Sequence, residues 1–131
     1  NAMAWEGQQM KVSLKAGASL AGKQFYFVKL NADDQVIVCA GATDVPIGVV
    51  QNAPASGETA EVVVCGVTKV SSDAALTAGN LIGTSADGQA DAKTAGTDTT
   101  EYVCGQVIEG SAAAGGLAVA AINCANLNRA A

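Results

Sequence analysis

A Val-rich stretch in the first half of the chain constrains the fold more than any other feature. Residues 44–70 contain two short apolar runs, 47–51 and 60–64, on either side of a turn that includes Pro54 and Gly57. Val and Ile branch at Cβ and pack well on a pleated surface, so both runs are expected to be strands. The stretch therefore predicts a buried β-hairpin, and it holds no set of side chains that could carry a reaction.

The other apolar runs are equally short and end at turn residues. Asp87-Gly88 is a strong hairpin signal, and residues 72–75 could form one capped helical turn. Residues 92–100 lack large apolar side chains and are expected to be an exposed loop. Further strands are expected at residues 9–14, 24–30, 36–39, 67–70, 81–84, 89–90, 102–109 and 117–122. This spacing predicts an all-β fold: a small single-domain β-barrel or sandwich with at most one short helix.

The length of 131 residues suits one domain with one core. We expect an N-terminal arm at residues 1–9, a β domain at residues 10–123 and a C-terminal tail at residues 124–131 that frays. Residues 1–2 resemble the remnant of a cleaved expression tag before Met3.

One hairpin pattern occurs twice. Residues 48–64, a strand, a turn of small residues and a second strand, are echoed by residues 105–121, which begin 57 positions later. This echo has two alternative explanations: duplication of one unit, or the independent occurrence of the same common type of hairpin at two places.

Charge and hydropathy narrow the possible partners. The net charge is −5, and the seven basic residues are scattered singly along the chain. Nucleic acid and anionic membranes both require clustered Lys and Arg, so neither is an expected partner. No apolar run approaches the roughly 20 residues that cross a bilayer.

The chain contains no His, which is the usual general base and the commonest metal ligand. Asp33, Asp34 and Asp87 lie in predicted turns, while Glu58 and Glu61 flank a strand start, so no opposed pair of acids can be recognised. We therefore expect no catalytic residue, no cofactor and no enzymatic activity.

Four cysteines, Cys39, Cys65, Cys104 and Cys124, are the remaining candidates for metal or redox chemistry. They form no Cys-x-x-Cys pair, and each lies within or at the end of an apolar run. We interpret them as free core thiols of a protein from a reducing compartment, with no metal site. Two disulfides or one four-thiolate metal site are the alternatives.

Several turn and core patterns together carry a family resemblance. They are Leu14-Lys15-Ala16-Gly17, Gln24-Phe25-Tyr26-Phe27-Val28-Lys29-Leu30, Asp44-Val45-Pro46-Ile47-Gly48-Val49-Val50-Gln51-Asn52-Ala53-Pro54, Gly57-Glu58, Val64-Cys65-Gly66-Val67-Thr68-Lys69-Val70, Leu76-Thr77-Ala78-Gly79-Asn80-Leu81-Ile82, Asp87-Gly88-Gln89-Ala90 and Tyr102-Val103-Cys104-Gly105. With them the chain resembles the head decoration, or capsid cement, proteins of tailed bacteriophages and prophages, over most of residues 10–123.

The resemblance implies a compact β-barrel-like protein that binds the outer surface of an assembled capsid and reinforces it. The implied partners are the major capsid protein and further copies of the chain, commonly in a homotrimer. The implied location is the virion surface, and the bacterial cytoplasm before assembly. No cofactor and no enzymatic activity are implied, and the cysteines are not part of the resemblance.

The polar N-terminal arm contributes two candidate capsid contacts, Trp5 and Met10. Large aromatic side chains are enriched as interface anchors, although Trp5 could instead pack against its own domain. The alternative function is a small ligand-binding or carbohydrate-binding β-module. Residues 25–27 are consecutive aromatic residues, so their side chains alternate between faces, and this disfavours a flat stacking platform.

Overall fold

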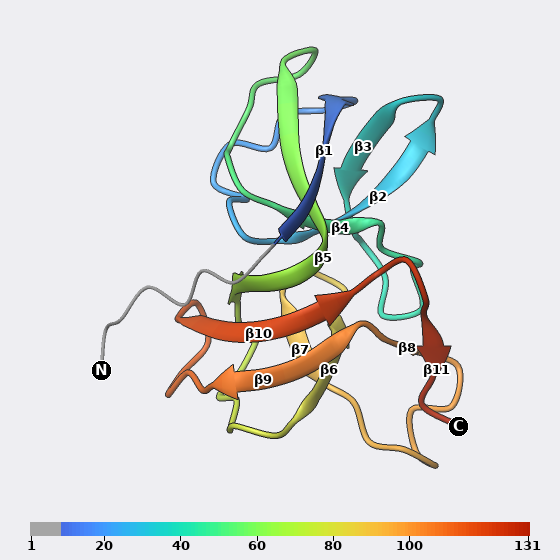
Figure 1. Cartoon of the computed structure of the whole chain (residues 1–131), viewed down its shortest axis with the longest axis vertical. Helices are drawn as coiled ribbons and strands as arrows, with labels where there is room; N and C mark the ends of the chain where they lie inside the picture. Colours follow the sequence, from blue (N-terminus) through green and yellow to red (C-terminus); the bar gives the residue numbers. More distant parts are fainter. Residues whose placement is uncertain (1–8) are drawn as a thin grey trace.

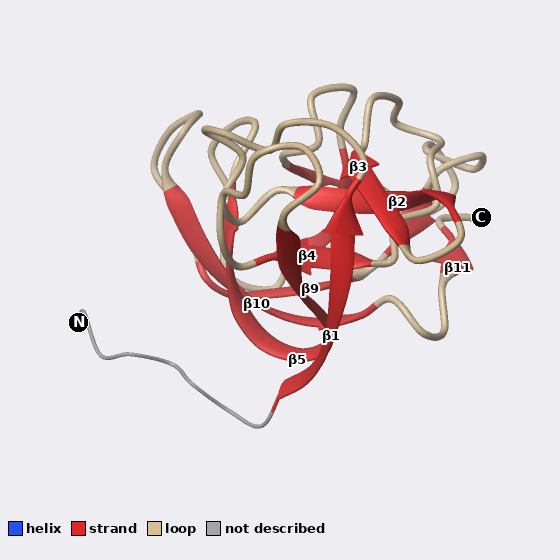
Figure 2. Cartoon of the chain, turned by 90° about the horizontal axis from the view of Figure 1, so that it is seen from above, coloured by secondary structure: helices blue, strands red, loops and turns tan. Residues whose placement is uncertain are grey.

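All regular structure in the described part of the chain is β-strand. The computed structural model describes residues 9–131, and no helix occurs among them (Figure 2). The strands are β1 (Gln9–Ala16), β2 (Phe27–Ala32), β3 (Gln35–Val38), β4 (Gly48–Val50), β5 (Thr59–Ser71), β6 (Leu81–Thr84), β7 (Ala90–Ala92), β8 (Tyr102–Val103), β9 (Gly105–Glu109), β10 (Leu117–Asn123) and β11 (Asn128–Arg129). The all-β prediction is confirmed, and the helical turn considered at residues 72–75 does not form.

Nine strands form one continuous mixed sheet that does not close as a single barrel. Its order is β1-β3-β2-β4-β5-β10-β9-β6-β7, and β8 and β11 form a separate two-stranded sheet. The predicted hairpins occur: β4 pairs with β5 with Val49 opposite Val63, and β6 pairs with β7 around the Asp87-Gly88 turn. β5 continues through Gly66, which has a φ of 133°.

Five strands make up a first unit, which comprises β1 to β4 and the first half of β5. In addition to its place in the sheet order, β1 pairs with β5, so the five strands are linked in a ring. One link of this ring is parallel, between β1 and β3 at Ala16 and Val36. The ring encloses a small aliphatic core of Ala16, Leu20, Val28, Val36, Val50, Ala60 and Val62.

The second unit is built from the second half of β5 together with β10, β9, β6 and β7. A parallel bridge between Ser72 and Ala90 returns from β7 to the end of β5, so this unit is also linked in a ring. In Figure 1 the first unit occupies the upper part of the molecule and the second unit the lower part, and β5 runs through both. β5 therefore serves as the shared strand.

The two units repeat the same pairings with the same strand directions. Each strand of the first unit has a counterpart in the second: β1 corresponds to the second half of β5, β3 to β7, β2 to β6, β4 to β9, and the first half of β5 to β10. The single parallel link has the same place in each ring. The repetition extends to single backbone hydrogen bonds. In each matched pair below, the bond of the first unit precedes its counterpart in the second unit, and each bond is written from the N–H donor to the carbonyl acceptor. The pairs are Gly17–Val36 with Asp73–Ala90; Leu20–Pro54 with Leu76–Ser111; Phe25–Val50 with Gly79–Val107; Tyr26–Lys23 with Asn80–Thr77; Cys39–Phe27 with Lys93–Leu81; Ile47–Val28 with Cys104–Ile82; Val50–Tyr26 with Val107–Asn80; and Gly57–Ala16 with Gly115–Ser72.

Backbone dihedrals repeat in the same way. The pairs with φ in the left-handed region are Asp34 (57°) and Gly88 (81°), Phe25 (67°) and Gly79 (94°), and Gly57 (86°) and Gly115 (82°). A bulky residue such as Phe rarely adopts this φ. The repeated path of the backbone places Phe25 there, at a position where the second unit has glycine. The hairpin echo in the sequence is thus one part of a repeat that spans the whole fold, which favours the duplicated-unit interpretation.

The two units share a buried contact. Phe27, Val49 and Val63 of the first unit are fully buried in one cluster with side chains of the second unit, including Val70 and Ile82. This larger cluster combines the interior of the second unit with the contact, and it joins the units into one folded body.

Residues 124–131, which the sequence sets apart as a tail, pack on the rest of the domain. Cys124 N donates to the Val64 carbonyl oxygen at 2.9 Å, and β11 pairs with β8. Ala130 is buried, and its N–H donates to the Glu101 carbonyl oxygen at 2.9 Å.

Candidate interaction surface

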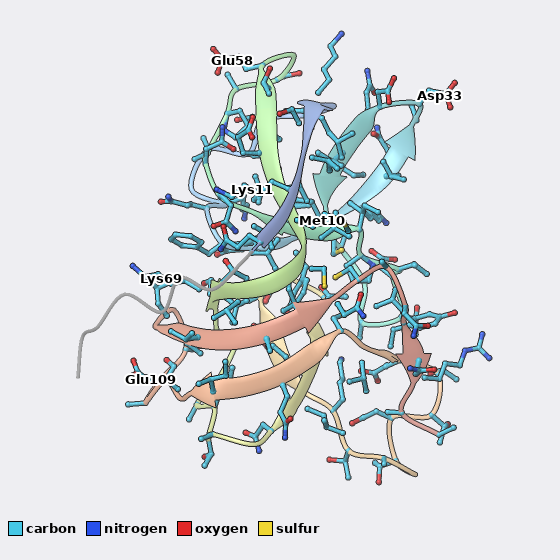
Figure 3. All side chains as sticks on the ribbon, viewed as in Figure 1. Met10, Lys11, Asp33, Glu58, Lys69 and Glu109 are labelled. Carbon is cyan, nitrogen blue, oxygen red and sulfur yellow. The ribbon has the colours of Figure 1, made fainter. Side chains whose placement is uncertain are left out.

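Of the two predicted capsid contacts, Met10 lies within the described residues and Trp5 lies outside them. Met10 is on β1 opposite Cys65 of β5, next to a register shift between Met10 and Lys11. Its side chain is 52% exposed. Figure 3 shows Met10 near the middle of the molecule, whereas the charged side chains of Glu58 and Asp33 lie at the ends of hairpins. Met10 is therefore accessible to a partner.

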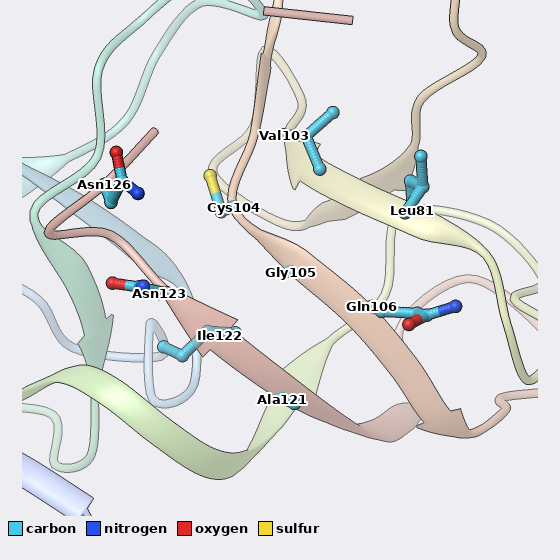
Figure 4. Close-up of a pocket in the computed structure, with 9 residues that line it drawn as sticks. All are labelled: Leu81, Val103, Cys104, Gly105, Gln106, Ala121, Ile122, Asn123 and Asn126. Carbon is cyan, nitrogen blue, oxygen red and sulfur yellow. The ribbon is translucent and has the colours of Figure 1, made fainter. Parts of the chain in front are cut away.

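Shallow apolar hollows mark the surface of both units. The first unit has one of about 340 Å³, lined by Val12, Leu14, Leu30, Ala32, Asp33, Asp34, Ile47 and Val64. The second unit has one of about 370 Å³, lined by Leu81, Val103, Cys104, Gly105, Gln106, Ala121, Ile122, Asn123 and Asn126 (Figure 4). We call them the first-unit hollow and the second-unit hollow. Their linings are aliphatic with a few amides and acids, which suits contact with another surface.

The large hydrophobic side chains that are exposed within residues 9–131 gather partly around these hollows. Val12 and Leu30 line the first-unit hollow, and Leu81 lines the second-unit hollow. Ile108 is exposed on β9, which also contributes Gly105 and Gln106 to the second-unit hollow. Clusters of exposed apolar residues on a small protein commonly mark interaction sites. Sequence patterning did not reveal these hollows, because alternation along a strand does not show which of its faces a second unit covers.

The four cysteines are free thiols, as the preferred interpretation expects. Cys39, Cys104 and Cys124 are buried in the larger core, and Cys65 is half-buried on β5. Burial raises the pKa of the Cys39 thiol to about 12. A hydrogen bond with Cys124, together with burial, raises the pKa of the Cys104 thiol above its ordinary value. Neutral buried thiols are weak nucleophiles and weak metal ligands.

One buried charge corrects an expectation from the sequence. The loop at residues 92–100 is largely exposed, but the side chain of Lys93 is completely buried. Its Nζ donates to the Thr84 carbonyl oxygen at 2.9 Å and to the Glu101 carboxylate. Asp91 lies at 3.8 Å from the same nitrogen. This pairing compensates the buried charge and anchors the loop between β7 and β8.

Several charged side chains lie close to other charged groups or to aromatic rings. Within residues 9–131 no group of three or more His, Cys, Asp and Glu side chains is placed to hold a metal ion. Burial, with Asp87 and Asp91 nearby, raises the pKa of Asp73. Lys23 lies over the ring of Tyr26 at 5.0 Å, and Arg129 over that of Tyr102 at 5.6 Å. Each of these two rings thus has a cation over one face. In the same part of the chain, no helix is long and apolar enough to span a bilayer.

The fold and its surface define a class: an all-β protein of two repeated five-strand units, each of which carries an exposed apolar hollow. Among solved structures, the chain is similar to the head fiber gp8.5 N base of bacteriophage phi29, with a TM-score of 0.64 and 17% sequence identity. The likeness covers 89% of this chain and 96% of that one, and at this identity it is a likeness of fold. No protein-family profile matches the chain. No curated protein sequence matches it either.

Proposed function

We propose that this chain is a structural protein of a phage or prophage virion that binds the outer surface of the assembled capsid and stabilises it. The observation that carries the proposal is the fold, which is shared over nearly the whole chain with the base of a phage head fiber. The head decoration proteins that the sequence resembles are also proteins of phage heads. Met10 and the two hollows supply accessible apolar surface for the contact.

The proposed mechanism is thermodynamic. A protein that binds the assembled lattice and not its free subunits stabilises the lattice by mass action, and many copies on one shell multiply a modest free energy per site. The partners are the major capsid protein and further copies of the chain, in a homotrimer. The action involves no catalytic step, cofactor, nucleic acid or membrane, and it takes place on the virion after synthesis in the bacterial cytoplasm.

The N-terminal arm is proposed to take part in the contact. It carries Trp5 and leads directly into β1, where Met10 is exposed. A terminal segment can gain order when it binds a partner, and a large aromatic anchor can then contribute strongly to affinity.

Co-sedimentation with capsids tests the proposal. Capsids of the encoding phage that lack this protein are mixed with the full chain, with a chain lacking residues 3–8, or with a Leu117→Ser control, which changes an exposed strand residue and leaves the arm intact. The full chain and the control are expected to saturate the capsids and raise their melting temperature, and the truncated chain to bind less. Absence of the full chain from the capsid pellet refutes capsid binding. Unchanged occupancy by the truncated chain refutes only the role of the arm.

A further inference from the structure

The contact between the two units within one chain has well-defined partners on each side. From the first unit come Phe27, Val49 and Val63, all fully buried. Phe27 N donates to the Gly88 carbonyl oxygen of the second unit at 2.7 Å. Gln51 Nε2 donates to Thr68 Oγ1 on the second half of β5 at 2.9 Å. The first unit thus presents its outer face to the second unit.

In the part of the chain that the structure describes, the same outer face on the second unit is uncovered. By the repeated pairings, Phe27, Val49 and Val63 correspond to Leu81, Gln106 and Ala121. These three counterparts line the second-unit hollow (Figure 4). Leu81 is 38% exposed, whereas Phe27 at the equivalent position is 0% exposed. The second-unit hollow is therefore the place where a following unit would pack.

The receiving side shows the opposite pattern. On the second unit, the side of the contact that faces the first unit contains the buried residues Thr68, Val70 and Thr84. Their counterparts in the first unit, by the repeated pairings, are Val12, Leu14 and Leu30. These three counterparts line the first-unit hollow. Leu30 is 53% exposed, whereas Thr84 is 1% exposed. The first-unit hollow is the place where a preceding unit would pack.

The backbone shows the same difference between a covered and an open unit. In the first unit Lys15 N donates to the Asp34 carbonyl oxygen at 2.8 Å. The equivalent groups of the second unit are used across the contact: Ser71 N donates to the Phe25 carbonyl oxygen at 2.9 Å, and the Gly88 carbonyl oxygen accepts from Phe27. A unit that packs on Lys15 and Asp34 in the same way would exchange one hydrogen bond for two.

We propose that the second-unit hollow of one copy docks on the first-unit hollow of a second copy, repeating between chains the contact that joins the units within a chain. Within one chain, Gln51 and Thr68 form a hydrogen-bonded pair across the contact. Their counterparts in the proposed contact between chains are Ile108 for Gln51 and Val12 for Thr68, which are 41% and 36% exposed. The polar pair within the chain thus becomes an apolar pair between chains, which suits a contact that must form from separate molecules. The arrangement is head to tail, so it forms a ring when the rotation per copy closes.

Mixing of two charge variants tests the arrangement without any capsid. Leu30→Asp disables the first-unit hollow, Ile108→Asp disables the face around the second-unit hollow, and Leu117→Asp is the control at an exposed strand residue outside both. Light scattering is expected to show an oligomer for the unmodified chain and the control, and single chains for the two variants. An equimolar mixture of the two variants is expected to form dimers and nothing larger, because each variant retains one intact face.

Other results overturn the inference. A single chain at every soluble concentration of the unmodified protein refutes self-association. Dimers of either variant alone, an unchanged mass, or a mixture that stays as single chains refute the head-to-tail contact. Circular dichroism of each variant confirms folding, which the exposure of Leu30 and Ile108 favours. A negative result in this mixing experiment would not refute capsid binding by a single chain. A negative result in co-sedimentation would not refute the head-to-tail contact.

Discussion

Gly88 provides a direct measure of how tightly the two units are joined. A Cβ added at Gly88 would lie 2.6 Å from Val38 Cγ2 and 3.0 Å from the Cys39 carbonyl oxygen, both in the first unit. Its φ of +81° also disfavours a side chain. The left-handed backbone costs about 1–2 kcal/mol, partly offset by about 0.4–1 kcal/mol from the restricted unfolded chain. Forcing an extra carbon into a packed contact adds about 1–3 kcal/mol. Gly88→Ala is therefore expected to lower the free energy of unfolding by about 2–4 kcal/mol.

Gly57→Ala is the matched control, because Gly57 has a φ of +86° and a Cβ there would meet no atom within 4 Å. It has the same backbone cost without the packing cost, and is expected to lose about 1 kcal/mol. Urea unfolding followed by circular dichroism gives both values. Equal losses for the two variants would refute the view that the second unit packs tightly on the first at Gly88.

Three further predictions concern the cysteines and the buried Lys93. Cys65 is expected to react with a thiol reagent in the folded protein, and the three buried cysteines only after unfolding, which a timed thiol titration measures. The pKa of Cys39 is raised in the folded protein to about 12 from an ordinary 9.0, so its contribution to stability is present below pH 9.0 and is lost as the pH rises toward 12. Urea unfolding at several pH values should show a shallower decline for Cys39→Ala. Lys93→Met is expected to cost about 3 kcal/mol because it leaves the Glu101 carboxylate without its cation, and Glu101→Gln in the same chain should recover part of that loss in the same assay.

The local elements were largely predictable from the sequence. Val-rich runs and turn residues indicate strand and hairpin positions, because side-chain alternation and turn dihedrals are properties of neighbouring residues. The central hairpin of β4 and β5 and the turn at Asp87-Gly88 occur as expected. The free, mostly buried cysteines also agree with the preferred interpretation.

The repeat was only partly visible in the sequence. The echo at Gly48 and Gly105 lies where the backbones of paired strands approach closely: a Cβ there would lie 2.3 Å from the Val63 carbonyl oxygen and 2.2 Å from that of Ala121, respectively. Only glycine fits such a contact, so this part of the pattern recurs. Elsewhere equivalent positions hold different residues. Leu30 and Thr84 are an example, because Leu30 is exposed whereas Thr84 is covered by the other unit.

By itself, then, the sequence determined the strands, the turns, the all-β class and the scarcity of reactive groups, because these depend on the chemistry of each residue and its near neighbours. The tertiary structure alone decided that β5 serves two units, that Lys93 is buried, that residues 124–131 pack on the domain and that two equivalent faces are left open. These features arise from contacts between residues far apart in the chain, whose closeness no local pattern records. The open faces in particular can be recognised only by comparing each unit with its folded counterpart.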